Sequence, residues 1–345
     1  MRHLELHIIQ SVPVACLNRD DLNSPKTAVF GGVQRARVSS QSWKRAIREL
    51  AKELSGDHFQ GERTRLLYEP LYQALLAEKL TAQEADEGAK AIVDGLVKLD
   101  TKSADRVKSK TLYFMSPLEM RTIAGEWVKT RDFKKARKAI TADALKDAAD
   151  IAIFGRMVAN DTSLNVEAAA MFSHALSTHR VDNEIDFFSA VDDLQPKGET
   201  GAGMTSTLEF NSATYYRFAA LNLDLLADPD HLGCLKPEER RDVVRTFVES
   251  TIKAVPGARR ATMNGYTLPV HVLEVVREHG HPVQLVNAFE RPVRGSEGYA
   301  GRSVELLKQE YTRLKDTWGL EAVFEKAIPE VNLSAFLKEI LSHVR

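Results

Sequence analysis

The start of the chain changes from an alternating pattern to a helical one. Apolar and polar residues alternate over residues 3–9, and this period of two predicts a half-buried strand. Residues 16–38 are polar and basic and contain two adjacent glycines, which is typical of a loop. From Trp43 onward apolar residues return at helical spacing, and Ser39 and Ser40 are suited to cap the helix. The pattern therefore predicts a strand, a long basic loop and a helix.

The middle of the chain is predicted to be helical. Apolar residues recur there at helical spacing, runs of β-branched residues are few, and Thr81 followed by Glu84 is the signature of a capping box. We therefore expect a helical insertion over residues 58–167. Its part between Lys102 and Lys138 is basic, a composition that is typical of a charge-rich surface helix and that also suits contact with nucleic acid.

Strand-like and loop-like patterns return in the second half of the chain. Residues 195–207 contain three glycines and a proline, which predict a loop that leaves the body of the protein. The stretch 208–223 is rich in the aromatic residues that strands favour. Two amphipathic helices are then expected, with apolar stripes over 243–252 and 304–318, and Gly319 would end the second.

The composition is that of a protein with a substantial core. The 345 residues exceed one small domain and predict two domains, or one domain with a large insertion. The sequence contains neither a signal-peptide core nor the ~20 apolar residues of a membrane span. Cys16 and Cys234 are isolated thiols without metal-ligand spacing. These features predict a cytoplasmic protein without a disulfide, a membrane contact, a bound metal or a cofactor.

The charges are distributed unevenly along the chain. A net charge of -1 argues against a strongly basic nucleic-acid binder, but residues 22–48 contain basic residues and no Asp or Glu. Lys44 and Arg48 share the helix face opposite Trp43, and because like charges at this spacing repel, the face favours an external anion. The first amides of the predicted helix would point the same way. The sequence therefore predicts a groove for a phosphate backbone, with a solvated charged helix face as the alternative. Its candidate residues are Lys26, Arg35, Arg37, Ser39, Ser40, Lys44, Arg45 and Arg48.

Residues 16–48, CLNRDDLNSPKTAVFGGVQRARVSSQSWKRAIR, closely resemble the N-terminal signature of the CasC family, the backbone subunit of the type I-E CRISPR Cascade surveillance complex. Supporting stretches include FGRMVAN (154–160) and VNAFERPV (286–293). The resemblance implies an α+β fold with an RRM-like (ferredoxin-like) palm formed by residues 1–57 and 168–345. A helical fingers insertion would occupy 58–167, and a β-hairpin thumb 192–212.

The resemblance also implies a function and a set of partners. Members of this family are not known for catalysis, so no catalytic residue is expected. Several copies associate head to tail along a CRISPR guide RNA and hold its backbone, and each thumb displaces a base at a periodic position. The guide then pairs with a target DNA strand, so that base pairing reads the sequence. The implied partners are the guide RNA, the target DNA, other copies of the chain and other Cascade subunits.

Position by position, the resemblance implies four groups of RNA contacts. Arg156 and Met157 would lie near the displaced base. Met204 or Leu208 would act as the wedge of the thumb, and residues 204–210 around them would contact the RNA. Arg259 and Arg260 would contact either RNA or a neighbouring subunit. The guide backbone would be held by Arg19, Lys26, Ser39, Gln41, Lys44, Arg45 and Arg48, and the thumb contacts would be Met204, Thr205, Leu208 and Phe210.

The main alternative is an RNase. Related backbone subunits of other CRISPR types cut RNA with an aspartate of the N-terminal loop, and Asp20 and Asp21 lie in the corresponding loop here. They belong to an NRDD motif that serves a non-cleaving subunit in the resembled family. A calcium loop starting at Asp182 is excluded, because its sixth position is Phe187 and not Gly. The acidic run 182–193 is instead a candidate contact between copies.

Overall fold

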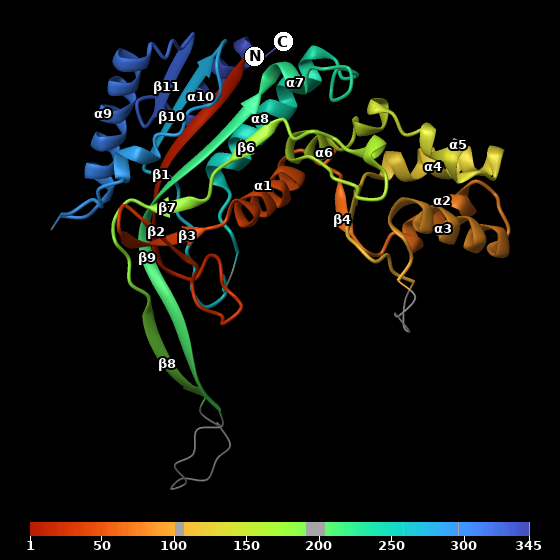
Figure 1. Ribbon diagram of the computed structural model, residues 1–345, viewed down its shortest axis with the longest axis horizontal. Helices are drawn as coiled ribbons and strands as arrows, with labels where there is room; N and C mark the ends of the chain where they lie inside the picture. Colours follow the sequence, from red (N-terminus) through yellow and green to blue (C-terminus); the bar gives the residue numbers. More distant parts are fainter. Residues whose placement is uncertain (101–106, 191–203, 258, 296, 345) are drawn as a thin grey trace, which may run out of the picture.

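The computed structural model describes residues 1–100, 107–190, 204–257, 259–295 and 297–344. Among these residues, an antiparallel sheet of nine strands forms one part of the protein and a helical lobe forms another (Figure 1). The two ends of the chain lie close together, since Arg2 Nη1 donates a hydrogen bond to the His343 carbonyl at 3.0 Å.

The centre of the sheet is a βαββαβ unit. Its elements are β1 (His3–Ala15), α1 (Ser40–Leu54), β7 (Ala175–Ser177), β9 (Met204–Asn222), α8 (Pro237–Lys253) and β10 (His271–Arg277). The four strands lie in the order β10-β1-β9-β7, and α1 and α8 pack together on one face. This is the element order of a ferredoxin-like fold, so the predicted α+β class with an RRM-like palm is confirmed.

Further strands extend this unit at both edges. β11 (Phe324–Ile328) continues the sheet beyond β10, and β6 (Ala170–Phe172) pairs with β9. β3 (Val33–Val38) and β2 (Thr27–Phe30) form a hairpin beyond β7, within the segment predicted to be a loop. The loop prediction is wrong there because Gly31 and Gly32 adopt positive φ angles of 61° and 74°, which form a tight hairpin turn. A Cβ on Gly31 would lie 1.7 Å from the Glu290 carbonyl oxygen.

β1 is buried on both faces, whereas its alternation predicted burial of one face only. Leu4, Leu6 and Ile8 belong to the core beneath α8 and α10 (Leu333–Ile340). On the opposite face, Glu5 is 2% exposed and ion-pairs with Arg277 at 3.2 Å. Contacts with α9 (Ala300–Trp318), which ends at Gly319 as predicted, cover this face. The polar residues that suggested solvent therefore form a buried network.

The helical lobe has a hydrophobic core of its own. The predicted capping box at Thr81 and Glu84 is confirmed at the start of α3, and a second begins α4. The elements within residues 58–167 are β4 (Glu62–Thr64), α2 (Tyr68–Ala77), α3 (Ala82–Val97), β5 (Tyr113–Met115), α4 (Pro117–Thr130), α5 (Phe133–Lys138), η1 (Ala142–Leu145), α6 (Ala149–Phe154) and η2 (Thr162–Leu164). Short helices of the sheet part are α7 (Leu223–Leu226), η3 (Val286–Phe289) and η4 (Leu341–His343).

A two-stranded arm projects from the sheet. β8 (Glu184–Ala190) pairs with the first part of β9, from Glu184 opposite Phe210 to Ala190 opposite Met204. Figure 1 shows this hairpin extending away from both the sheet and the helical lobe. Of the segment 192–212 that was predicted to be a thumb, residues 192–203 lie outside the described residues.

Glu274 of β10 makes the fold sensitive to pH. Its side chain is fully buried, neither carboxyl oxygen has a hydrogen-bond partner, and burial followed by repulsion from Glu339 raises its pKa well above the ordinary value. Because the native state then holds this proton more tightly than the unfolded chain, the stabilising effect is present at low pH and is lost as pH rises through the native pKa.

We predict that Glu274→Met raises the free energy of unfolding at pH 8 by about 1–3 kcal/mol, because an unpaired buried polar group is removed. The gain should shrink as the pH falls toward 5. Urea denaturation at several pH values measures it, with the exposed Glu321→Met as the matched control. A gain that is independent of pH would contradict the assignment.

Candidate nucleic-acid interface

Helix α1 is held against the sheet by its apolar stripe and by a buried arginine. Trp43, Ile47 and Ala51 are at most 3% exposed, as the spacing predicted. The Arg217 guanidinium of β9 lies 3.7 Å from the centre of the Trp43 ring and donates to Gln10 Oε1 at 2.6 Å. Burial lowers the pKa of Arg217 to about 9. This contact fixes the face of α1 that remains accessible.

Lys44 and Arg48, on that accessible side, each lie over an aromatic ring. Lys44 Nζ is 5.3 Å from the centre of the Phe172 ring of β6, and Arg48 Cζ is 5.0 Å from that of Phe114 of β5. Burial lowers the pKa of both cations. The two rings support half-buried cations, and a partly desolvated cation attracts an anion more strongly than a solvated one.

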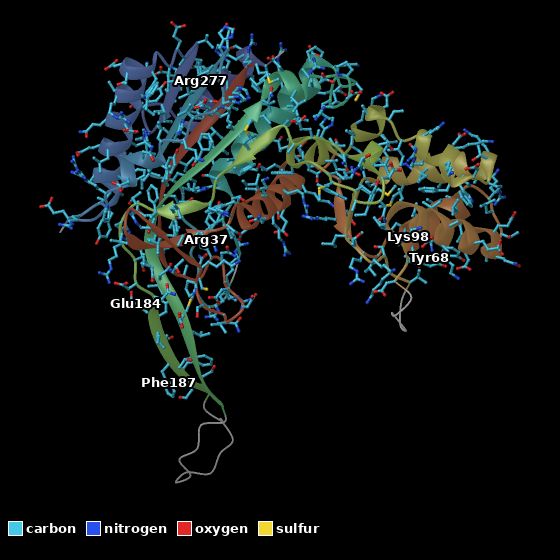
Figure 2. The ribbon with its side chains drawn as sticks, in the orientation of Figure 1. Arg37, Tyr68, Lys98, Glu184, Phe187 and Arg277 are labelled. Carbon is cyan, nitrogen blue, oxygen red and sulfur yellow. The ribbon has the colours of Figure 1, made fainter. Side chains whose placement is uncertain are left out.

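The start of α1 carries a second group of basic residues. Ser39 caps the helix, and its backbone N–H donates to Asn18 Oδ1 at 2.9 Å. Arg37 donates to the Thr27 carbonyl and lies near the base of the arm (Figure 2). His174 accepts a hydrogen bond from the Ser40 N–H at 3.0 Å. Burial, then Arg37 and Lys26, lowers the pKa of His174, which shows that positive charge gathers here.

Not every amide in the first turn of α1 is available to an anion, in contrast to the prediction. The Ser40 N–H is bonded to His174 Nδ1, and the Ser42 N–H to the Ser39 hydroxyl. The Gln41 side chain is exposed beside them. Side-chain cations at this end of the helix are therefore better placed than the amides to provide an anion site.

A polar hollow of about 580 Å³ lies between α1, the loop after β1 and Pro256-Gly257. Arg19 and Arg45 line it with Asp20 and Glu49. Arg45 is exposed and pairs with Glu49 at 2.7 Å, and Arg19 donates to Asn23 Oδ1 at 3.1 Å. These exposed contacts are weak, so both cations are free to exchange partners.

Arg35 and Arg156, which were predicted to contact RNA, lie inside the protein. Arg35 is 0% exposed and donates to the carbonyls of Phe30, Ser177, Phe289 and Glu290. These bonds join the β2–β3 hairpin to distant segments. A buried guanidinium with this many partners does not reach a phosphate, so the prediction that Arg35 contacts RNA is wrong.

Arg156 is 7% exposed and is occupied within the helical lobe. It pairs with Glu119 at 2.7 Å and donates to the carbonyls of Phe114 and Leu164. Because Arg156 is buried and its donors are occupied, as in Arg35, the prediction that it contacts RNA is wrong. The adjacent Met157, by contrast, is 85% exposed.

The remaining predicted residues lie on two other surfaces. Leu208 and Phe210 are half-buried on the arm, directly opposite Asp186 and Glu184, and Figure 2 shows Glu184 along the arm. Nothing is described for the side chains of Met204 and Thr205, which lie nearer the tip. Arg260 is exposed, and Arg259 has a positive φ of 53° in the loop that follows α8.

The predicted alternative, cleavage by Asp20 or Asp21, can be compared with the loop geometry. Asp20 Oδ1 accepts hydrogen bonds from the backbone N–H groups of Leu22 at 2.9 Å and Ser24 at 3.0 Å. Its carboxylate therefore shapes the loop, and both Asp20 and Asp21 are exposed. The described residues contain no group of three His, Cys, Asp or Glu side chains suited to hold a metal ion.

Residues that sequence patterns did not reveal complete the interface. Phe114, Phe172 and His174 contact Lys44, Arg48 or the start of α1, and Arg217 anchors the helix. Each is far from α1 in the sequence, and no local pattern distinguishes it from other core or loop residues. Phe172 and His174 do lie in one short stretch around β6.

The structural role of Arg35 leads to a stability prediction. Arg35→Met should lower the free energy of unfolding by about 3 kcal/mol or more, because several buried carbonyls lose their donor. Gln41→Met, at an exposed site of α1, should change it by less than about 0.5 kcal/mol. Urea denaturation measures both, and equal stabilities of the two variants would contradict the structural role of Arg35.

Comparison with known proteins identifies a family and solved structures that are similar to this chain. The family model for CT1975-like proteins matches residues 4–339. One solved structure, "CRISPR RNA-guided surveillance complex, pre-nicking", contains a chain that is 29% identical, with a TM-score of 0.84 over 99% of this chain and 100% of that one. A chain of a second, "CRISPR RNA-guided surveillance complex", is 26% identical, with a TM-score of 0.73 over 99% of each.

No curated protein sequence matches the chain. Within the described residues, every helix is too short or too polar to cross a membrane. The family match covers nearly the whole chain, including α1 and the elements that support its cations. The resemblance noted for residues 16–48 is confirmed, and the chain belongs to the CT1975-like family of CasC-type proteins.

Proposed function

We propose that the protein is a non-catalytic backbone subunit of a CRISPR RNA-guided surveillance complex and that α1 holds the backbone of the guide RNA. One observation carries the proposal: Lys44 and Arg48 are half-buried on one helix face, and neither forms an ion pair with a described residue. A half-buried cation without an ion-pair partner is costly. A row of phosphates supplies negative charge in direct contact with both cations.

Similarity to subunits of solved surveillance complexes supports this proposal. The candidate groups are cations and hydroxyls, which position a nucleic-acid backbone and do not read base edges. We therefore expect little sequence preference. RNA affinity should depend strongly on salt, because each neutralised phosphate releases bound counterions. The proposed backbone contacts are Arg19, Lys26, Arg37, Ser39, Ser40, Gln41, Lys44, Arg45 and Arg48.

The arm and the helical segment extend the proposal to the assembly. We propose that residues 192–212 act as a thumb that displaces guide bases, with Met204, Thr205, Leu208 and Phe210 as its contacts. The segment 58–167 would form the fingers on the palm of 1–57 and 168–345. Copies would associate head to tail along the RNA. Such heterologous contacts form a helical filament when they do not close into a ring. Met157, Arg259 and Arg260 would contact RNA or a neighbouring copy, and the exposed guide bases would pair with target DNA.

The interface predicts the outcome of charge reversal. Lys44→Glu with Arg48→Glu should abolish co-purification with guide RNA, because two phosphate contacts become repulsive, while the protein stays folded. The matched control is the double reversal Lys308→Glu with Lys338→Glu on α9 and α10, where both side chains are exposed. Recovery of RNA is measured by nucleic-acid staining of the purified protein. Wild-type recovery by the α1 variant would refute the assignment of the groove.

The non-catalytic role is tested separately. We expect labelled single-stranded RNA to remain intact with the protein and Mg²⁺ or Mn²⁺, because the Asp20 carboxylate is engaged by its own loop. Gel analysis over several hours measures this. Cleavage that is lost in Asp20→Asn or Asp21→Asn would establish the RNase alternative.

A further inference from the structure

Asp150 is a buried carboxylate close to the proposed phosphate site. It lies in the first turn of α6 and is 0% exposed. Its Oδ1 accepts a hydrogen bond from the Gly61 N–H at 3.2 Å, and its Oδ2 has no hydrogen-bond partner. The chain passes directly over it, since a Cβ on Gly61 would lie 2.5 and 2.7 Å from the two oxygens. The ionised group is therefore poorly solvated.

The charges that act on Asp150 come from the interface itself. Arg48 of α1 contributes most to its stabilisation as an anion, and Lys52 of the same helix contributes less. Lys52 is already paired with Glu62 of β4 at 3.2 Å, and Arg63 of β4 repels Arg48. Phe114 contacts both sides of the cluster, because Arg48 lies over its ring and the ring approaches Gly61.

Arg48 can therefore interact with two anions, the Asp150 carboxylate and a bound phosphate. Without RNA it compensates the Asp150 carboxylate through space, although no ion pair joins these two described side chains. A phosphate bound to Arg48 would be a second anion beside a carboxylate that has no donor for Oδ2. Two poorly solvated anions sharing one cation repel each other, and the carboxylate can relieve the repulsion by taking a proton from solvent.

We propose that Asp150 is a positioning residue of the guide-RNA site, which acts through Arg48 and takes up one proton when a phosphodiester binds there. The inference rests on the proposed function of α1. The raised pKa of Asp150, about 6 because of burial and opposed by Arg48, supports it, since the carboxyl titrates just below neutrality before RNA is bound. RNA should consequently bind more tightly as the pH falls from 8 toward 6.

The experiment measures RNA binding and proton uptake together. The full-length protein is titrated with a single-stranded RNA oligomer at fixed salt, between pH 5.5 and 8. We expect affinity to fall by up to about tenfold per pH unit above pH 6, the limit for one linked proton. Calorimetry in buffers of different ionisation enthalpy should show uptake of up to one proton per bound site.

Asp150→Asn is the matched variant, because it keeps the shape and the acceptor for Gly61. It should bind RNA at pH 7.5 about as tightly as the wild type does near pH 6, with a flat pH profile. His174→Gln is the control, since His174 is a further titratable group at this face of α1 and its removal should leave the Asp150-linked slope in place. Thermal unfolding checks that both variants are folded.

The outcomes separate this inference from the proposed function. If wild-type protein binds RNA without proton uptake, or if Asp150→Asn keeps the wild-type slope, the role of Asp150 is overturned and the RNA site stands. If wild-type protein does not bind RNA at any pH, both are overturned. Absence of proton uptake by wild-type protein overturns the role of Asp150 even if the variant fails to fold.

Discussion

Strand β9 connects the parts of this protein, because it pairs with β1, β6, β7 and β8 along its 19 residues. Its later residues form the centre of the sheet, while its first residues form half of the arm. β9 is one continuous strand whose register with β1 shifts between Val12 and Ala15, so the direction of the arm is set where β9 leaves the core. Tyr216, whose hydroxyl accepts from the Leu285 N–H, and Arg217, which contacts Trp43, attach opposite layers to this strand.

Buried arginines divide the basic residues into two functions. Arg217 anchors α1, and Arg35 joins the β2–β3 hairpin to Phe289, 254 residues away in sequence. Their carbonyl and aromatic partners are worth more in a dry interior than in water, and their loss is correspondingly costly. Lys44 and Arg48 differ because aromatic rings support them and neither forms an ion pair with a described residue. The net charge of -1 thus averages structural cations, cations at the interface and acidic surface.

Local patterns predicted the elements whose stability is local. The stripe from Trp43 and the Ser39 cap predicted α1, and Thr81 with Glu84 predicted the start of α3, since capping and helical spacing act within a few residues. The resemblance of residues 16–48 supplied the palm. The roles of Arg35 and Asp150 were not predictable, because the carbonyls around the first and the Gly61 amide beside the second are brought near only by the fold.

The arm shows why this fold calls for a partner. A two-stranded hairpin that stands clear of a core is at best marginally stable in water. Here Ile185 and Phe187 are 69% and 67% exposed on one face, while Leu208 and Phe210 lie on the other. Neither face is covered by a described residue to the extent that a core strand is. Packing against RNA bases or another copy would bury this apolar surface, so assembly and the ordering of the arm are expected to occur together.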